Sequence, residues 1–96
     1  MAHCTLPPAA TSLAVAHRTV EEIWFVLAGT GEIWRRDGDS EQVDVLSPGV
    51  GLSIPTGTHF QFRNRGAMPL QILIATMPTW PGADEAYRVG DHWRVE

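Results

Sequence analysis

The stretch Val20-Glu21-Glu22-Ile23-Trp24-Phe25-Val26-Leu27-Ala28-Gly29 decides how this chain folds. Every residue between Glu22 and Gly29 is apolar, and aromatic and branched side chains dominate, which favours a β-strand. Successive side chains of a strand point to opposite faces, so Trp24 and Val26 share one face and the alternate apolar residues share the other. Gly29 then starts a turn. The stretch therefore predicts a strand whose two faces are both buried.

Turn-forming residues recur at short intervals on both sides of this strand. The 96 residues include 9 Gly and 7 Pro, which leaves little room for long helices. The segments between the turns have strand length, and a short helix is expected after Pro81, over 82–88. The pattern predicts an all-β fold, an antiparallel barrel or sandwich of about eight short strands. The expected strands are 2–6, 12–18, 22–28, 31–36, 41–46, 50–54, 58–63 and 69–77.

The two-sided apolar character of 22–28 needs an explanation, because an antiparallel strand of a small barrel usually has one face in water. Residues 70–77 show the same character, interrupted only by Gln71 and Thr76. Packing of two sheets, with these strands at their centre, would cover one face. A second subunit would cover the other face. We expect both, and hence a homodimer.

Two motifs at fixed spacing resemble those of the cupin superfamily. In the first, over 15–29, four residues separate His17 from Glu22, and six residues separate Glu22 from Gly29. The second, over 49–64, reads Gly49, five residues, Pro55-Thr56-Gly57, two residues, Phe60, three residues and Asn64. The chain is thus similar to small single-domain cupins of the conserved-barrel type, sometimes labelled mannose-6-phosphate isomerase-like. The resemblance implies one antiparallel jelly-roll β-barrel over 1–96, followed from about residue 78 by a tail rich in Trp and Pro.

The family's metal site is incomplete in this sequence. The resemblance implies two His and one Glu from the first motif and one His from the second. Carried over, these positions hold Val15, His17, Glu22 and Phe60. Two donors are too few for a catalytic divalent metal, which usually takes three or more protein ligands. A local bulge that brought in His59 would complete a set of His17, Glu22 and His59, so a divalent metal stays an open alternative.

The inward positions of the barrel are expected to line a pocket for a small molecule. His17 and Glu22 are the candidate polar or catalytic contacts, either hydrogen-bonded to each other or acting as an acid–base pair. Three functions remain open: a small-molecule-binding cupin with a degraded metal site, an isomerase-, dioxygenase- or cyclase-like enzyme, and a non-catalytic dimeric interaction module. The expected pocket residues are Val15, Trp24, Val26, Phe60, Phe62 and Asn64.

Composition excludes several other partners. The net charge is −4 and the seven basic residues, all Arg, form no run, which argues against a nucleic-acid surface. No apolar run approaches the roughly 18–20 residues of a membrane span. Residues 1–15 do not resemble a signal peptide, and the single Cys4 cannot form an internal disulfide, so we expect a cytoplasmic protein.

Overall fold

The computed structural model describes residues 1–82 and 84–95, and within them it contains nine strands and no helix. Most of the expected strands form within one or two residues of their predicted bounds. The strands are β1 (Ala2–Leu6), β2 (Val15–His17), β3 (Glu21–Ala28), β4 (Gly31–Asp37), β5 (Ser40–Leu46), β6 (Gly51–Ile54), β7 (His59–Asn64), β8 (Leu70–Met77) and β9 (Ala86–Arg88).

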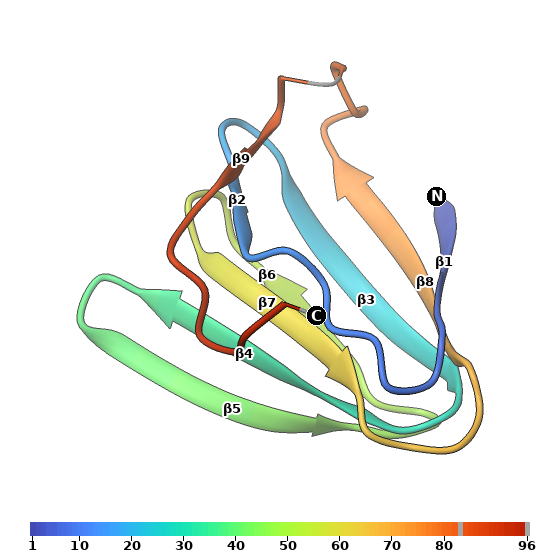
Figure 1. The fold of residues 1–96 in the computed structure, drawn as a ribbon. Helices are drawn as coiled ribbons and strands as arrows, with labels where there is room; N and C mark the ends of the chain where they lie inside the picture. Colours follow the sequence, from blue (N-terminus) through green and yellow to red (C-terminus); the bar gives the residue numbers. More distant parts are fainter. Residues whose placement is uncertain (83, 96) are drawn as a thin grey trace.

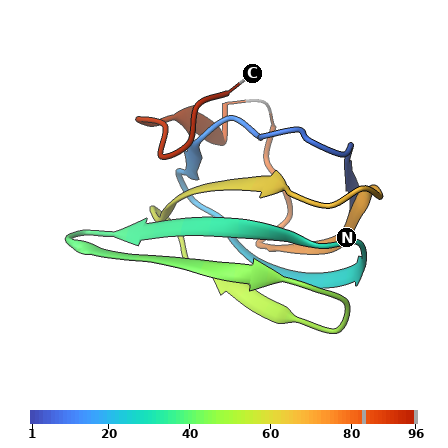
Figure 2. The same ribbon diagram turned by 60° about the horizontal axis from the view of Figure 1, so that its bottom comes forward.

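The strands form two antiparallel sheets that face each other across a common interior (Figures 1 and 2). The first sheet has the order β1-β8-β3-β6, and the second has the order β5-β4-β7-β2-β9. Chain neighbours such as β2 and β3 lie in opposite sheets, which is the arrangement of a jelly roll. The all-β prediction is confirmed. No helix in the described part of the chain is long and apolar enough to cross a membrane.

Position 29, at the end of this stretch, requires a glycine because of its backbone conformation and its close neighbours. Its φ of 82° lies in the left-handed region, where a side chain is unfavourable. A Cβ atom there would also come within 2.4 Å of the Pro69 carbonyl oxygen. The β3–β4 turn therefore depends on a residue without a side chain.

Apolar side chains that alternate along the strands point inward and fill the interior. Trp24 and Val26 point inward from β3 and meet Phe60 and Phe62 of β7. The Trp24 ring lies edge-on to both phenylalanines, with centroid distances of 5.7 Å to Phe60 and 4.9 Å to Phe62. Burying these large rings supplies much of the apolar stabilisation that a chain of this size can obtain.

The helix predicted over 82–88 is wrong. Residue 83 lies outside the described residues, and Ala86–Arg88 is strand β9. This strand pairs with β2, opposite Val15–His17, so sheet hydrogen bonds outweigh a weak local helix signal. The strand predicted over 12–18 is correspondingly shorter, Val15–His17.

The outward face of the first sheet is apolar and exposed. On β3, Ile23, Phe25 and Leu27 keep 48%, 46% and 41% of their surface accessible. On the neighbouring strand β8, Ala75 lies opposite Ile23 and Leu73 lies opposite Phe25. We call these five residues the apolar sheet face. Packing of the two sheets thus covers only one of the two apolar faces seen in the sequence.

Candidate functional site

His17 and Glu22 come from different sheets. His17 ends β2 in the second sheet, and Glu22 lies near the start of β3 in the first. Both are buried, with 4% and 6% of their surface exposed. Three residues, 18–20, connect the two strands, and this turn lies at the end of the barrel at the top of Figure 1.

Glu22 does not pair with His17 as predicted. Its carboxylate instead accepts a hydrogen bond from Nε1 of Trp24, at 2.9 Å. That bond satisfies the indole N–H, which would otherwise be buried without a partner. Burial, and next the charge of Glu22, raise the pKa of the Cys4 thiol on β1. The expected hydrogen-bonded His–Glu pair is therefore replaced by a carboxylate tied to a core tryptophan.

His17 is held by aromatic rings rather than by hydrogen bonds. The ring lies edge-on to Phe60 and to Trp80, at centroid distances of 5.3 and 5.2 Å. Its Nδ1 atom is buried and has no hydrogen-bond partner among the described residues. Trp80 belongs to the segment after β8 and brings that segment over the barrel end.

A cavity of about 430 Å³ opens at this end and reaches Glu22. Glu22 is the ionisable side chain of its wall, Trp80 supplies an aromatic ring, and two threonines supply hydroxyl groups. We call it the barrel-end cavity. Its lining residues are Met1, Ala2, Glu22, Ile74, Thr76, Thr79 and Trp80.

The residues predicted to line the pocket are placed elsewhere. Trp24, Val26, Phe60 and Phe62 form the packed core, and Val15 packs against it. Asn64 holds a turn, donating hydrogen bonds to the carbonyl oxygens of Leu6 and Met68 and accepting one from Gly66 N. The aromatic side chains fill the part of the interior that they were expected to surround.

The residues present do not fit the family's metal site. Phe60 points into the core, whereas His59 lies on the outward face of β7, opposite Arg36. Bringing His59 inward would expose Phe60 and Phe62, and β7 does not shift its register to do so. Across residues 1–82 and 84–95, no group of three His, Cys, Asp or Glu side chains is placed to hold a metal ion. His17 and Glu22 are not joined by His59.

Glu85 is a buried residue that no sequence pattern singles out. Its carboxylate accepts hydrogen bonds from Thr19 N at 2.6 Å, Thr19 Oγ1 at 2.6 Å and Val20 N at 2.9 Å. Burial raises the pKa of Glu85, but these bonds and the nearby His17 outweigh burial and lower the pKa to about 2. Glu85 thereby fixes the β2–β3 turn between His17 and Glu22. No spacing rule links it to residues some 65 positions earlier.

Comparison with known proteins identifies the family. Residues 2–76 match the family model described as "Cupin domain", so this chain belongs to the cupin family. The structure of the capsular polysaccharide assembling protein CapF from Staphylococcus aureus superposes with a TM-score of 0.80 at 21% identity, covering 91% of this chain and 27% of that one. Bacillus subtilis oxalate decarboxylase, described with Mn(II) centres, gives 0.71 at 17% identity, covering 77% and 20%.

The sequence relatives include proteins named for polysaccharide biosynthesis. The xanthan biosynthesis protein XanB of Xanthomonas campestris is 30% identical over 87 residues, 91% of this chain. The chain spans only 18% of that protein's length. The match thus links this cupin domain to one part of a larger polysaccharide-biosynthesis protein.

Proposed function

We propose that this chain binds a small, neutral, hydroxyl-rich molecule such as a sugar in the barrel-end cavity. The observation that carries the proposal is the composition of the cavity wall: a Trp80 ring, the Glu22 carboxylate, and the threonines Thr76 and Thr79 around about 430 Å³. That volume is in the range of small-molecule sites, about 300–1,000 Å³.

The wall chemistry suits a sugar. An aromatic ring packs against the apolar C–H face of a pyranose, and carboxylate and hydroxyl groups exchange hydrogen bonds with its hydroxyls. The negative charge of Glu22 disfavours an anionic group at this place, so a neutral sugar is expected to bind better than its phosphate. The names of the relatives in polysaccharide biosynthesis support the same chemical class.

The acid–base alternative has less support. Glu22 lines the cavity, but His17 is not among its lining residues and makes no hydrogen bond to Glu22. Sugar binding by Glu22 does not require an acid–base pair with His17.

The test is a titration of the whole chain with neutral monosaccharides, beginning with mannose. Binding is measured by calorimetry and by NMR, and mannose 1-phosphate is titrated in parallel to compare a neutral sugar with its phosphate. Trp80→Ala and Glu22→Gln are each expected to weaken mannose binding about tenfold or more. Glu21→Gln is the matched control, because Glu21 is the adjacent carboxylate and is exposed. Absence of saturable binding of any neutral sugar, or equal loss in the Glu21 variant, would contradict the proposal.

We also propose that the chain forms a homodimer through the apolar sheet face. Three large apolar side chains on one strand, each more than 40% exposed, form a patch of the kind that marks interfaces. A second copy offers the same apolar surface, and a two-fold axis would bring the two faces together. Light scattering after gel filtration, over a range of concentrations, tests this: a mass of one chain throughout contradicts the dimer.

A further inference from the structure

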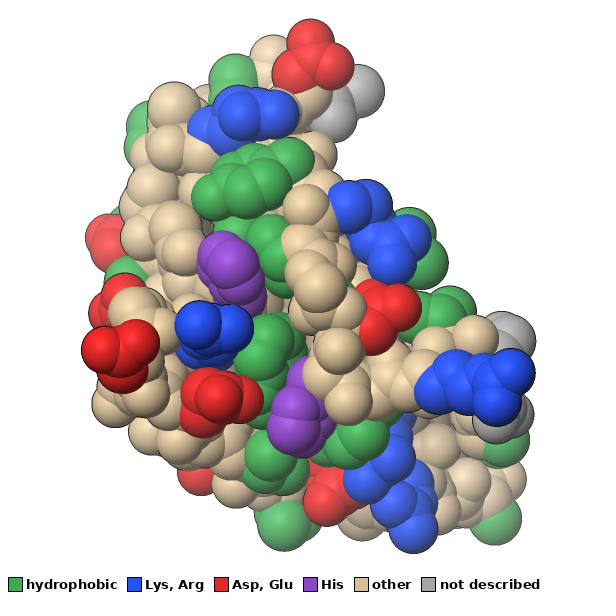
Figure 3. Space-filling model, turned by 60° about the vertical axis from the view of Figure 1, so that its left-hand side comes forward, with side chains coloured by type: hydrophobic (Ala, Val, Ile, Leu, Met, Phe, Trp, Pro, Cys, Tyr) green, Lys and Arg blue, Asp and Glu red, His purple; other side chains and the backbone are tan. Residues whose placement is uncertain are grey.

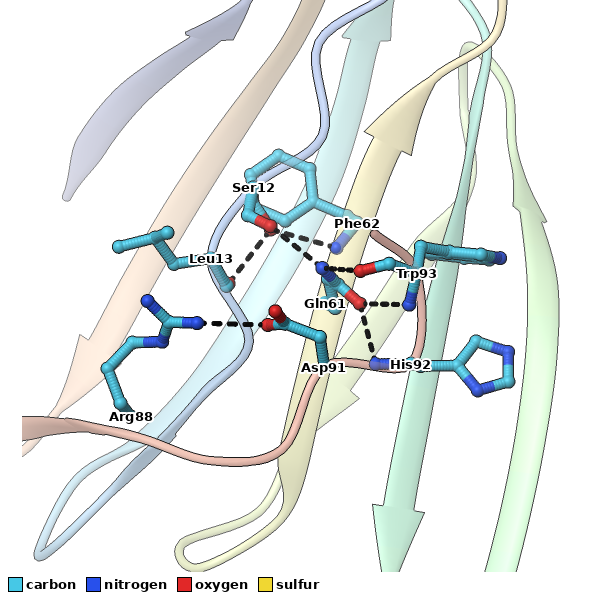
Figure 4. Close-up of polar contacts among 8 residues, drawn as sticks. All are labelled: Ser12, Leu13, Gln61, Phe62, Arg88, Asp91, His92 and Trp93. Atoms are coloured by element: carbon cyan, nitrogen blue, oxygen red, sulfur yellow. Dashed lines mark hydrogen bonds and ion pairs between the residues drawn. The ribbon is translucent and has the colours of Figure 1, made fainter. Parts of the chain in front are cut away.

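The C-terminal segment, residues 84–95, first forms strand β9 at the edge of the second sheet, and then crosses the outward face of that sheet, where Gln61 fastens it. The Gln61 side chain is fully buried and makes four hydrogen bonds (Figure 4). It accepts from the backbone N–H groups of His92 and Trp93, and donates to the carbonyls of Ser12 and Trp93. A buried side chain with every bond satisfied holds this segment in one position.

The fastened segment creates a groove at the end of the barrel opposite Glu22. Glu22 is near the start of β3, whereas Arg63 and Arg65 lie at and just beyond the end of β7, at the bottom of Figure 1. The groove holds about 420 Å³ and is lined in part by Arg63, Arg65, Trp93 and Arg94. We call it the arginine groove.

Arg63 is held in place within the groove. Its guanidinium lies 4.0 Å from the centre of the Trp93 ring, and Nε and Nη2 contact Oε1 of Glu32 at 2.9 and 2.7 Å. Stacking on an aromatic ring and an ion pair on one edge fix the plane of a guanidinium. The groove is thus a built site rather than a set of unrelated surface side chains.

The charge balance of the groove is positive in a chain whose net charge is −4. Three of the seven arginines line it, and none of its described lining residues is acidic. Glu32, beside the groove, contacts both Arg63 and, at 3.6 Å, Arg65. Among residues 1–82 and 84–95, one carboxylate shared by two guanidiniums, with Arg94 as a third, leaves an excess of about two positive charges.

We propose that the arginine groove binds the oxyanion group, phosphate or carboxylate, of a small acidic molecule. Guanidinium groups donate paired hydrogen bonds that match the oxygens of both groups. The site is separate from the barrel-end cavity, where Glu22 favours a neutral ligand, so neither proposal depends on the other.

The test uses inorganic phosphate and citrate as probes, titrated into the whole chain at low ionic strength and followed by NMR. Saturable binding that moves the indole N–H signal of Trp93, and leaves that of buried Trp24 in place, is expected. Arg94→Gln and Arg65→Gln should each weaken binding about tenfold. Arg36→Gln is the matched control, since it removes one positive charge from an exposed arginine outside the groove.

Each outcome decides the matter. Saturable binding of either probe supports the site. The probe that binds more tightly shows whether the groove prefers phosphate or carboxylate. No saturable binding of either probe, or equal weakening by Arg36→Gln, overturns it. Trp80→Ala should leave probe binding unchanged, and this result separates failure at the groove from failure at the barrel-end cavity.

Discussion

The two outward sheet faces of this small barrel differ, because the chain covers one of them and leaves the other exposed. On the second sheet the C-terminal segment of the same chain lies over Trp34 and Gln61 and buries both. On the first sheet the apolar sheet face has no cover among the described residues of the chain. Polar anchors fix a segment of the same chain on one face, whereas the exposed apolar residues of β3 leave the other face suited to a second copy.

The surface character follows the same division. The side of the molecule turned forward in Figure 3 carries basic, acidic and histidine side chains interspersed with apolar ones. The apolar sheet face, by contrast, has five neighbouring apolar residues on β3 and β8. A mixed surface is normal for contact with water, and a continuous apolar one is a mark of an interface.

The largest effect is expected from detaching the C-terminal segment. Gln61→Leu removes four hydrogen bonds and leaves backbone groups of Ser12, His92 and Trp93 without partners. The free energy of unfolding should fall by about 2–4 kcal/mol, measured by urea denaturation. Gln42→Leu, on an exposed residue of β5, should change it by no more than about 0.5 kcal/mol. Equal stability of the two variants would show that the segment is not fastened by Gln61.

The next effect concerns the apolar sheet face. Phe25→Asp places a charge at its centre and should weaken the dimer by about 100-fold or more, measured by analytical ultracentrifugation. Val43→Asp is the matched control, because Val43 on the other sheet is also 46% exposed. A dimer that survives Phe25→Asp, or that Val43→Asp disrupts equally, would place the interface elsewhere.

A smaller effect is expected where the C-terminal segment stacks on the sheet. The His92 ring lies parallel to that of Trp34, at a centroid distance of 5.0 Å and an angle of 2°. His92→Ala should lower the free energy of unfolding by about 1 kcal/mol and raise hydrogen exchange in residues 91–95. His3→Ala, which removes an exposed histidine of β1, serves as the reference. Unchanged exchange in His92→Ala would mean that stacking adds nothing to the Gln61 anchor.

The smallest effect concerns Glu85, which bonds the start of the C-terminal segment to the β2–β3 turn. Its effect on stability is expected only at acidic pH. Its pKa in the folded chain is about 2, below the ordinary value of 4.5. The stability it contributes is therefore complete above about pH 4.5 and is lost as the pH falls towards 2. Thermal melts across this window should show a shallower decline for Glu85→Gln than for the parent chain. Asp84→Asn, at an exposed neighbour, should keep the parent slope; an identical slope in Glu85→Gln would contradict the assignment.

Local sequence rules predicted the strands and the interior well. Alternation placed Trp24 and Phe60 inside, because the period of two holds for any strand with one face in a core. The same rules placed a pocket among these rings and left open whether His17 and Glu22 form a hydrogen-bonded pair, an acid–base pair or part of a metal site; the two side chains share no hydrogen bond. The spacing of residues along a strand predicts which face a side chain lies on. It does not predict which inward-pointing group that side chain contacts, or how much cavity volume the aromatic rings leave.

The sequence by itself determined the cupin family, the two-sheet barrel and the presence of a second apolar face on β3. These follow from alternation, turn residues and motif spacing, all of which act over a few neighbouring positions. Only the tertiary structure decided the partners of Gln61, Glu85 and Arg63, and with them the two cavities at opposite ends. Those contacts join residues 30 or more positions apart, and no local pattern encodes which distant segment will satisfy a buried polar group.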